Sequence, residues 1–108
     1  MRKRIGAHVV MEKLVPRIPE EYRKIYDIPE KHESMAIFSA DCEDVMWLAV
    51  DDATKKAKIK VIQIETVYGG VDYSWSRYGG EITAIISGEK VADVKSGLHY
   101  AKDYIENK

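Results

Sequence analysis

Hydrophobic and polar residues follow two different periods along this chain, and these periods predict seven elements. Short runs of β-branched and apolar residues predict strands, whereas apolar residues that recur every three or four positions predict helices. Strands are expected at residues 5–15, 34–40, 59–68 and 81–88, and helices at 19–27, from Asp41 into the lysines at 55–58, and from Ser87 to Ile105. The predicted order is therefore β-α-β-α-β-β-α.

Prolines set the limits of the first predicted helix. Pro16 and Pro19 end the first strand, and Pro19 suits the first turn of a short helix. Glu20 and Glu21 then lie at the N-terminal end, where the helix dipole favours negative charge. Pro29 closes this helix because proline disfavours a helical conformation in the residue before it.

The second helix is predicted from its start and from an apolar stripe. Asp41 is expected to be the N-cap, with Asp44 three residues later, as in a capping box. Lys55, Lys56 and Lys58 crowd the C-terminal end, where the dipole favours cations. The stripe has helical spacing and consists of Val45, Met46, Leu48, Ala49, Ala53 and Ala57.

The remaining elements predict an α+β fold, an antiparallel sheet with helices on it. Residues 34–40 are apolar on both faces, which indicates a central strand. Residues 59–68 and 81–88 are expected to pair as antiparallel strands. Ser87 is expected to cap the last helix, and Gly97 within it suggests close packing against a neighbour. The apolar face of that helix is Val91, Val94, Leu98, Ala101 and Ile105.

Composition narrows the class of protein. A chain of 108 residues with 45% hydrophobic and 32% charged residues is expected to fold as one domain, residues 1–108. The net charge of −1 gives no general attraction to nucleic acid or to a membrane surface. No apolar run approaches the roughly 18 residues that a membrane span needs, and no secretory signal is recognised. The single cysteine, Cys42, fits a reducing compartment, so a cytoplasmic location is expected.

The stretch YGGVDYSWSRYGGE, residues 68–81, has an unusual composition. It holds three tyrosines, one tryptophan and four glycines. Glycine permits positive φ angles and changes of conformation. Tyrosine and tryptophan supply rigid surface with a polar tip. The sequence therefore raises the question of what this aromatic, glycine-rich loop contacts.

Two long stretches carry a resemblance to a known family. SADCEDVMWLAVDDATKKAKIKV (39–61) and GGEITAIISGEKVADVKSGLHYAKDYIEN (79–107) resemble the bacterial microcompartment (BMC) shell domain. The chain is most similar to the circularly permuted domains of the ethanolamine-utilization L-type shell proteins, from about residue 7 to residue 107. Those proteins carry two such domains in tandem and assemble as trimers, whereas this chain carries one. The resemblance thus implies six copies in a ring, a homohexameric tile of a shell with a central pore for small polar metabolites.

In this family the connection between the strands that end near Tyr68 and begin near Glu81 runs towards the pore. The resemblance implies a pore or gating loop that consists of Gly69, Gly70, Asp72, Tyr73, Ser74, Trp75, Ser76, Arg77, Tyr78, Gly79 and Gly80. The alternative is a hairpin loop that packs on its own or on a neighbour's surface.

The resemblance also implies a small-ligand pocket at Glu43, Asp44 and Glu81, positions that lie near a pocket for an amino alcohol in the L-type proteins. Carboxylates suit an ammonium group, and Trp47 or Trp75 would add a cation–π face. The alternative is that Asp41 and Asp44 only cap the helix.

A tile-edge contact is implied at Lys55, which aligns with a lysine that bonds backbone carbonyls across the seam between neighbouring tiles. Lys56 is the competing residue, because a shift of one position rotates the assignment by about 100° around the helix. The alternative for either is a solvated lysine favoured by the helix dipole.

No catalytic or metal-binding motif is recognised. His8, His32 and His99 lack metal-ligand spacing, and there is no phosphate-binding glycine loop. Cys42 is expected to be a buried or half-buried thiol rather than part of an iron–sulfur site. No enzyme activity, metal or cofactor is therefore expected.

The sequence thus predicts a structural shell subunit whose partners are further copies, other shell proteins and small metabolites, with no nucleic acid or membrane. The competing interpretation is a freestanding small-ligand sensor of ferredoxin-like α+β fold, whose loop closes over a metabolite.

Overall fold

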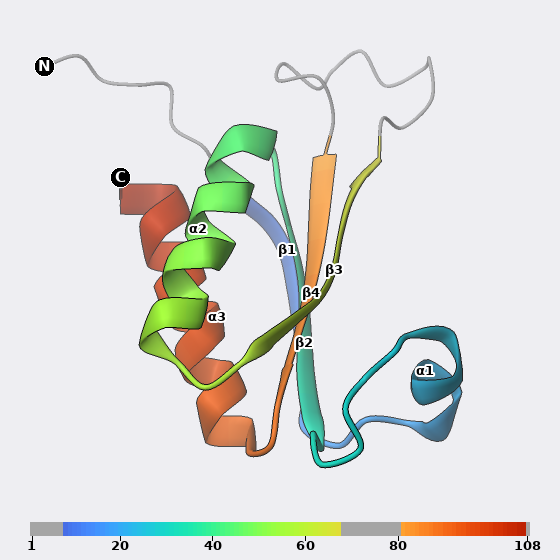
Figure 1. Cartoon of the computed structure of the whole chain (residues 1–108). Helices are drawn as coiled ribbons and strands as arrows, with labels where there is room; N and C mark the ends of the chain where they lie inside the picture. The colour runs from blue at the N-terminus through green and yellow to red at the C-terminus, as the bar shows by residue number, and fades with distance from the viewer. Residues whose placement is uncertain (1–7, 68–80, 108) are drawn as a thin grey trace, which may run out of the picture.

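The computed structural model describes residues 8–67 and 81–107, and it contains the seven predicted elements in the predicted order (Figure 1). They are β1 (Val9–Val15), α1 (Glu20–Ile25), β2 (Ser34–Ala40), α2 (Glu43–Lys56), β3 (Lys60–Val67), β4 (Glu81–Gly88) and α3 (Val91–Asn107). The predictions for β2 and β4 are confirmed residue for residue. The expected start of the first strand, residues 5–7, lies outside the described residues.

The four strands form one sheet in the order β1-β2-β4-β3, with every neighbouring pair antiparallel. β2 is therefore a central strand, as its two apolar faces predict. β3 and β4 pair with each other, as expected for strands joined by one connection. The edges of the sheet are β1 and β3.

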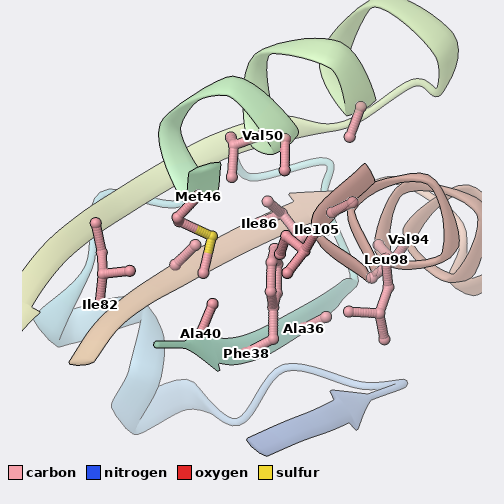
Figure 2. Packing of buried hydrophobic residues seen from close by; sticks show 14 residues of the cluster. Ala36, Phe38, Ala40, Met46, Val50, Ile82, Ile86, Val94, Leu98 and Ile105 are labelled. Carbon is pink, nitrogen blue, oxygen red and sulfur yellow. The ribbon is translucent and has the colours of Figure 1, made fainter. Parts of the chain in front are cut away.

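Two long helices cover one face of the sheet. α3 contacts β1, β2 and β4, whereas α2 contacts β3 and β4 and lies beside α3 (Figure 1). Side chains of β2 and β4 meet those of the two helices in the main core (Figure 2). The largest fully buried side chains there are Phe38, Met46, Ile82, Ile86 and Ile105.

The opposite face of the sheet is partly covered by α1 and the segments beside it. Ile18 and Ile28 pack there against Met35 of β2 and Ile85 of β4. β2 is therefore buried on both of its apolar faces, by the helix pair on one side and by the α1 region on the other.

Asp41 does not cap α2, contrary to the sequence prediction. The helix begins at Glu43, its N-cap is Cys42, and no side chain makes a capping bond. The Asp41 carboxylate instead accepts a hydrogen bond from the His8 backbone N–H at 2.8 Å. The Asp41 N–H donates to the His8 carbonyl. Residue 41 is therefore still tied to the start of β1, which delays the helix.

The prediction that Ser87 caps the last helix is also wrong. Ser87 lies within β4, opposite Met35 and Lys60, and is fully buried. α3 begins at Val91, and the Lys90 carbonyl accepts bonds from the N–H groups of its first turn. Ser87 is close in sequence to the start of α3, but it is a paired residue of the sheet and is not available as a cap.

Two smaller corrections concern α1 and α2. Pro19 is the N-cap of α1 rather than part of its first turn. In α2, the predicted stripe fails at Leu48, which is exposed, while Val50 is buried beside Met46, Ala49 and Ala53. At about 100° per residue, Leu48 is about 200° from Met46 and points away from the sheet.

Gly97 of α3 confirms the predicted close approach. A Cβ at this position would lie 2.8 Å from Cδ1 and 3.0 Å from Cγ2 of Ile59. The glycine therefore allows the segment before β3 to pack against α3.

Candidate functional site

One end of the sheet brings the predicted pocket residues to the same region. Ala40, the last residue of β2, pairs with Ile82 of β4, and Val67 at the end of β3 pairs with Glu81. α2 begins three residues after Ala40. The start of α2, the end of β3 and the start of β4 therefore share one end of the molecule (Figure 1).

The predicted pore loop connects β3 to β4 at this end. All eleven of its residues, Gly69, Gly70 and 72–80, lie outside the described residues. What the structure does place are the two strand ends that flank them, Val67 and Glu81.

The acidic residues at this end belong to two different elements. Glu43 is half-buried and Asp44 is exposed, both in the first turn of α2, where the helix dipole favours negative charge. Glu81 is the first residue of β4, and the structure describes its place in the strand but not its side chain. Trp47 follows Asp44 by three residues, so the two side chains are neighbours on α2. The grouping of Glu43, Asp44 and Glu81 into one ligand pocket stays a prediction.

Cys42 is half-buried and packs against the main core, as expected for a structural thiol. Within residues 8–67 and 81–107, no group of three or more His, Cys, Asp or Glu side chains is placed to hold a metal ion. Among the helices of this same part of the chain, none has the length and apolar character that crossing a membrane requires.

The opposite end of α2 separates the two candidate edge lysines. The Lys56 Nζ atom lies 3.2 Å from the Asp52 Oδ2 atom and 5.5 Å from the centre of the Tyr100 ring of α3. Lys55 pairs with Asp51 at 3.2 Å, and its side chain is 72% exposed. Because Lys56 faces α3 and Lys55 does not, Lys55 is better placed to contact another molecule.

A groove of about 610 Å³ lies near the Lys55 end of α2 and was not predicted. It is open to solvent and combines basic, acidic and apolar side chains from four segments. Its lining residues are Pro29, His32, Thr54, Ala57, Lys58, Ile59, Lys60, Glu89 and Asp93. These residues show no common motif, so only the tertiary fold brings them together.

Several hydrogen bonds hold His32 and its loop in this groove. Its Nδ1 lies 2.7 Å from the Ser87 hydroxyl. The Arg23 guanidinium donates hydrogen bonds to the carbonyls of Pro29 and His32, which fixes the loop that carries the imidazole. Burial lowers the pKa of His32, with smaller contributions from Lys60 and Arg23, while Glu89 opposes the shift. No local pattern indicates this contact, because His32 and Ser87 are 55 residues apart.

Comparison with known proteins gives consistent matches. Residues 34–108 match the family model of the BMC domain. The chain is 31% identical over 103 residues to the bacterial microcompartment shell protein EutL of Clostridium perfringens, covering 95% of this chain and 48% of that protein. It is 28% identical to EutL of Escherichia coli, again over 95% of this chain and 47% of the relative.

Solved structures match in the same way. The crystal structure of the ethanolamine utilization protein EutL from Leptotrichia buccalis superposes with a TM-score of 0.86 at 40% identity, covering 98% of this chain and 49% of that chain. A trimeric bacterial microcompartment shell protein, PduB, superposes with a TM-score of 0.70 at 18% identity, a likeness of fold alone. The chain spans about half the length of the curated relatives it matches.

Proposed function

Because this chain belongs to the BMC domain family, we propose that it is a structural subunit of a bacterial microcompartment shell and not an enzyme. The observation that carries the proposal is the similarity to shell proteins along 95% of the chain, rather than along one motif. Its location would then be the shell of a microcompartment in the cytoplasm. Its partners would be further copies of itself and other shell proteins.

The proposed assembly is a cyclic hexamer. The related chains are about twice as long as this one, and one structural neighbour, PduB, is a trimer. A ring of the same size, built from units of half the length, requires six copies of this domain. Such a ring is a closed symmetric assembly in which one contact is repeated around the axis.

We place the central opening of this ring at the end that carries residues 69–80. The end of β3, the start of β4 and the start of α2 meet there. In a ring, the side chains at this end would recur once for each copy around the axis. The glycines and aromatic residues of the segment suit a loop that lines or closes a narrow passage. Small polar metabolites would pass through it.

Deletion of residues 71–78 tests the role of this loop. The shortened connection keeps Gly69, Gly70, Gly79 and Gly80, which suit a tight turn between two antiparallel strands. We expect the number of copies in the oligomer, measured by light scattering, to be unchanged and the flux of small solutes through assembled shells to change. Loss of the oligomer on deletion would refute a gating role.

The acidic residues Glu43, Asp44 and Glu81 are proposed as a small-ligand pocket beside this opening. Two of them lie in one helical turn and the third begins the neighbouring strand, which supports a shared site. A ligand with an ammonium group and a hydroxyl fits carboxylate acceptors. Ethanolamine is the suitable probe, and its binding, measured by calorimetry, should weaken in Glu43→Gln and Asp44→Asn.

One observation favours a form of the second candidate, a freestanding small-ligand sensor whose ligand would lie in the groove at His32 and not under the loop of residues 68–81. The groove at His32 has a volume within the range of common ligand sites. A ligand of this groove would stabilise the fold by about 2.7 kcal/mol at a hundredfold excess over its Kd. A discrete protein that never forms sheets, but is stabilised by a metabolite in a thermal screen, would favour this function over the shell.

A further inference from the structure

Two exposed apolar patches lie on opposite flanks of the molecule. The α2 patch consists of Trp47, 51% exposed, and Leu48, 56% exposed. The β1 patch consists of Val10, 50% exposed, and Met11, 42% exposed. α2 lies over the β3 side of the sheet, whereas β1 is the edge strand on the other side (Figure 1).

The direction of Trp47 supports this division. Lys56 marks the side of α2 that faces α3, since its ammonium lies over Tyr100. Trp47 precedes Lys56 by nine residues, which places it about 180° around the helix. Its side chain therefore points away from α3, towards the flank of the molecule that β1 does not occupy.

Neither edge strand is suited to simple extension of the sheet. The register of β1 shifts between Val9 and Met11, which leaves Val10 as the extra residue of a bulge. β3 has a similar shift between Val61 and Gln63. Bulges disrupt the row of free hydrogen-bonding groups on an edge. A partner at the β1 flank is therefore expected to contact side chains rather than to add a strand.

The charges beside the two patches are complementary. Asp44 and Asp51 are the helical neighbours of Trp47, and of these two Asp51 is paired with Lys55 at 3.2 Å. Lys13 follows Met11 by two residues on β1, and its exposed side chain makes no hydrogen bond or ion pair to the residues that the structure describes. Glu12 of β1 is paired with Lys102 of α3, so the charges left beside the two patches are Lys13 and Asp44, which have opposite signs.

We propose that the α2 patch of one copy binds the β1 patch of the next copy, head to tail. Repetition of a contact between two different surfaces generates a ring or a filament. The inference rests on the proposed ring, and it names the side chains that would hold it together.

A mixing experiment tests the head-to-tail contact. Trp47→Lys places a cation opposite Lys13. Val10→Asn replaces an apolar side chain of the β1 patch by an amide that the apolar α2 patch cannot pair, and the two altered patches do not attract each other. Each variant retains one intact patch, so each alone should have the mass of a single 12.3 kDa chain by light scattering. An equimolar mixture, at the highest concentration at which each variant alone is monomeric, should give twice that mass, because only one compatible contact remains.

Controls separate the contact from the fold and from the proposed function. Ile25→Lys changes an exposed apolar residue on α1, outside both patches, and should leave the oligomer intact. If Trp47→Lys fails to fold by circular dichroism, a charge exchange replaces it. Lys13→Glu and Asp44→Lys should each lower the oligomer mass, and the double variant should restore it.

The outcomes distinguish the two claims. Oligomers that persist in both patch variants, or a mixture that gives no dimer, overturn the contact while the proposed shell role stands. A wild-type chain that stays monomeric overturns both. A mixed dimer together with a wild-type ring of another size supports the contact and contradicts the hexamer.

Discussion

The contact between Gly97 and Ile59 shows how a single residue sets the distance between two elements. Alanine at position 97 would gain about 1 kcal/mol of helix propensity, but its Cβ would lie 2.8 Å from Ile59 Cδ1. Overpacking of this kind costs about 1–3 kcal/mol. The two effects oppose each other, and the steric cost is expected to win.

We therefore predict that Gly97→Ala lowers the free energy of unfolding by about 1 kcal/mol. Urea denaturation of the variant measures this. Ile59→Val removes the Cδ1 atom that the new methyl group meets, so the double variant should lose less than the two single variants together. Simple additivity would show that the close approach does not limit the packing.

His32 gives the molecule a predictable dependence on pH. Its pKa lies below the ordinary 6.5 because of burial, so the unfolded chain takes up a proton before the folded protein does. The free energy of unfolding should therefore be highest above pH 6.5 and fall as the pH decreases towards the lowered value.

His32→Asn tests this expectation, because an amide can keep a hydrogen bond to Ser87 without titrating. We predict that the loss of stability between pH 7.5 and pH 5.5, measured by chemical denaturation, becomes smaller in this variant. His99→Asn, on the exposed face of α3, is the matched control. An equal decrease in the wild type and in His32→Asn would assign the pH dependence to other groups.

Residue-level predictions failed where a polar side chain had two competing uses. Asp41 and Ser87 both have the types and positions of helix caps. Asp41 is instead bonded to His8, which directly precedes β1, and Ser87 lies within β4, where its hydroxyl contacts His32. These partners are 33 and 55 residues away, and no local pattern reports such distances.

At the scale of elements, hydrophobic periodicity was enough to predict order and type. β2 and β4 are apolar runs bounded by polar residues, and their limits match the sequence prediction. The spacing of apolar residues predicts α2 correctly. It misplaces Leu48 in the buried stripe because hydrophobicity alone does not show which apolar residues face the sheet, and Leu48 is exposed. Whether Leu48 and Trp47 are exposed depends on which other parts of the molecule cover α2, and the residues around them in the sequence do not specify this.

The two ends of α2 allow a direct test of the proposed tile edge. Lys55 points away from the fold, whereas Lys56 is held by Asp52 and Tyr100. The pair between Lys55 and Asp51 is a surface ion pair worth about 0.3–0.5 kcal/mol, so Lys55 can exchange partners at little cost.

We predict that Lys55→Glu abolishes the lateral assembly of tiles into flat sheets, seen by electron microscopy, without changing the mass of the individual ring. Lys56→Glu is the matched control at the neighbouring position and should still form sheets. Sheets in both variants would remove Lys55 from the edge contact.

At the scale of the whole molecule, the sequence predicted the fold but not the surfaces. The α+β order and the antiparallel sheet follow from periodicity, and the resemblance to BMC domains agrees with the matched family. The groove at His32 and the opposed patches of α2 and β1 arise from residues far apart in the chain. Their positions follow from packing, which spacing alone does not specify.

The proposed shell tile requires that this half-length chain closes a ring by itself. The most direct measurement is the mass of the purified wild-type protein by light scattering after size exclusion, over a range of concentrations. A hexameric tile has six times the mass of the 12.3 kDa chain, and we expect this mass. A monomer or dimer that persists as the concentration rises would contradict it.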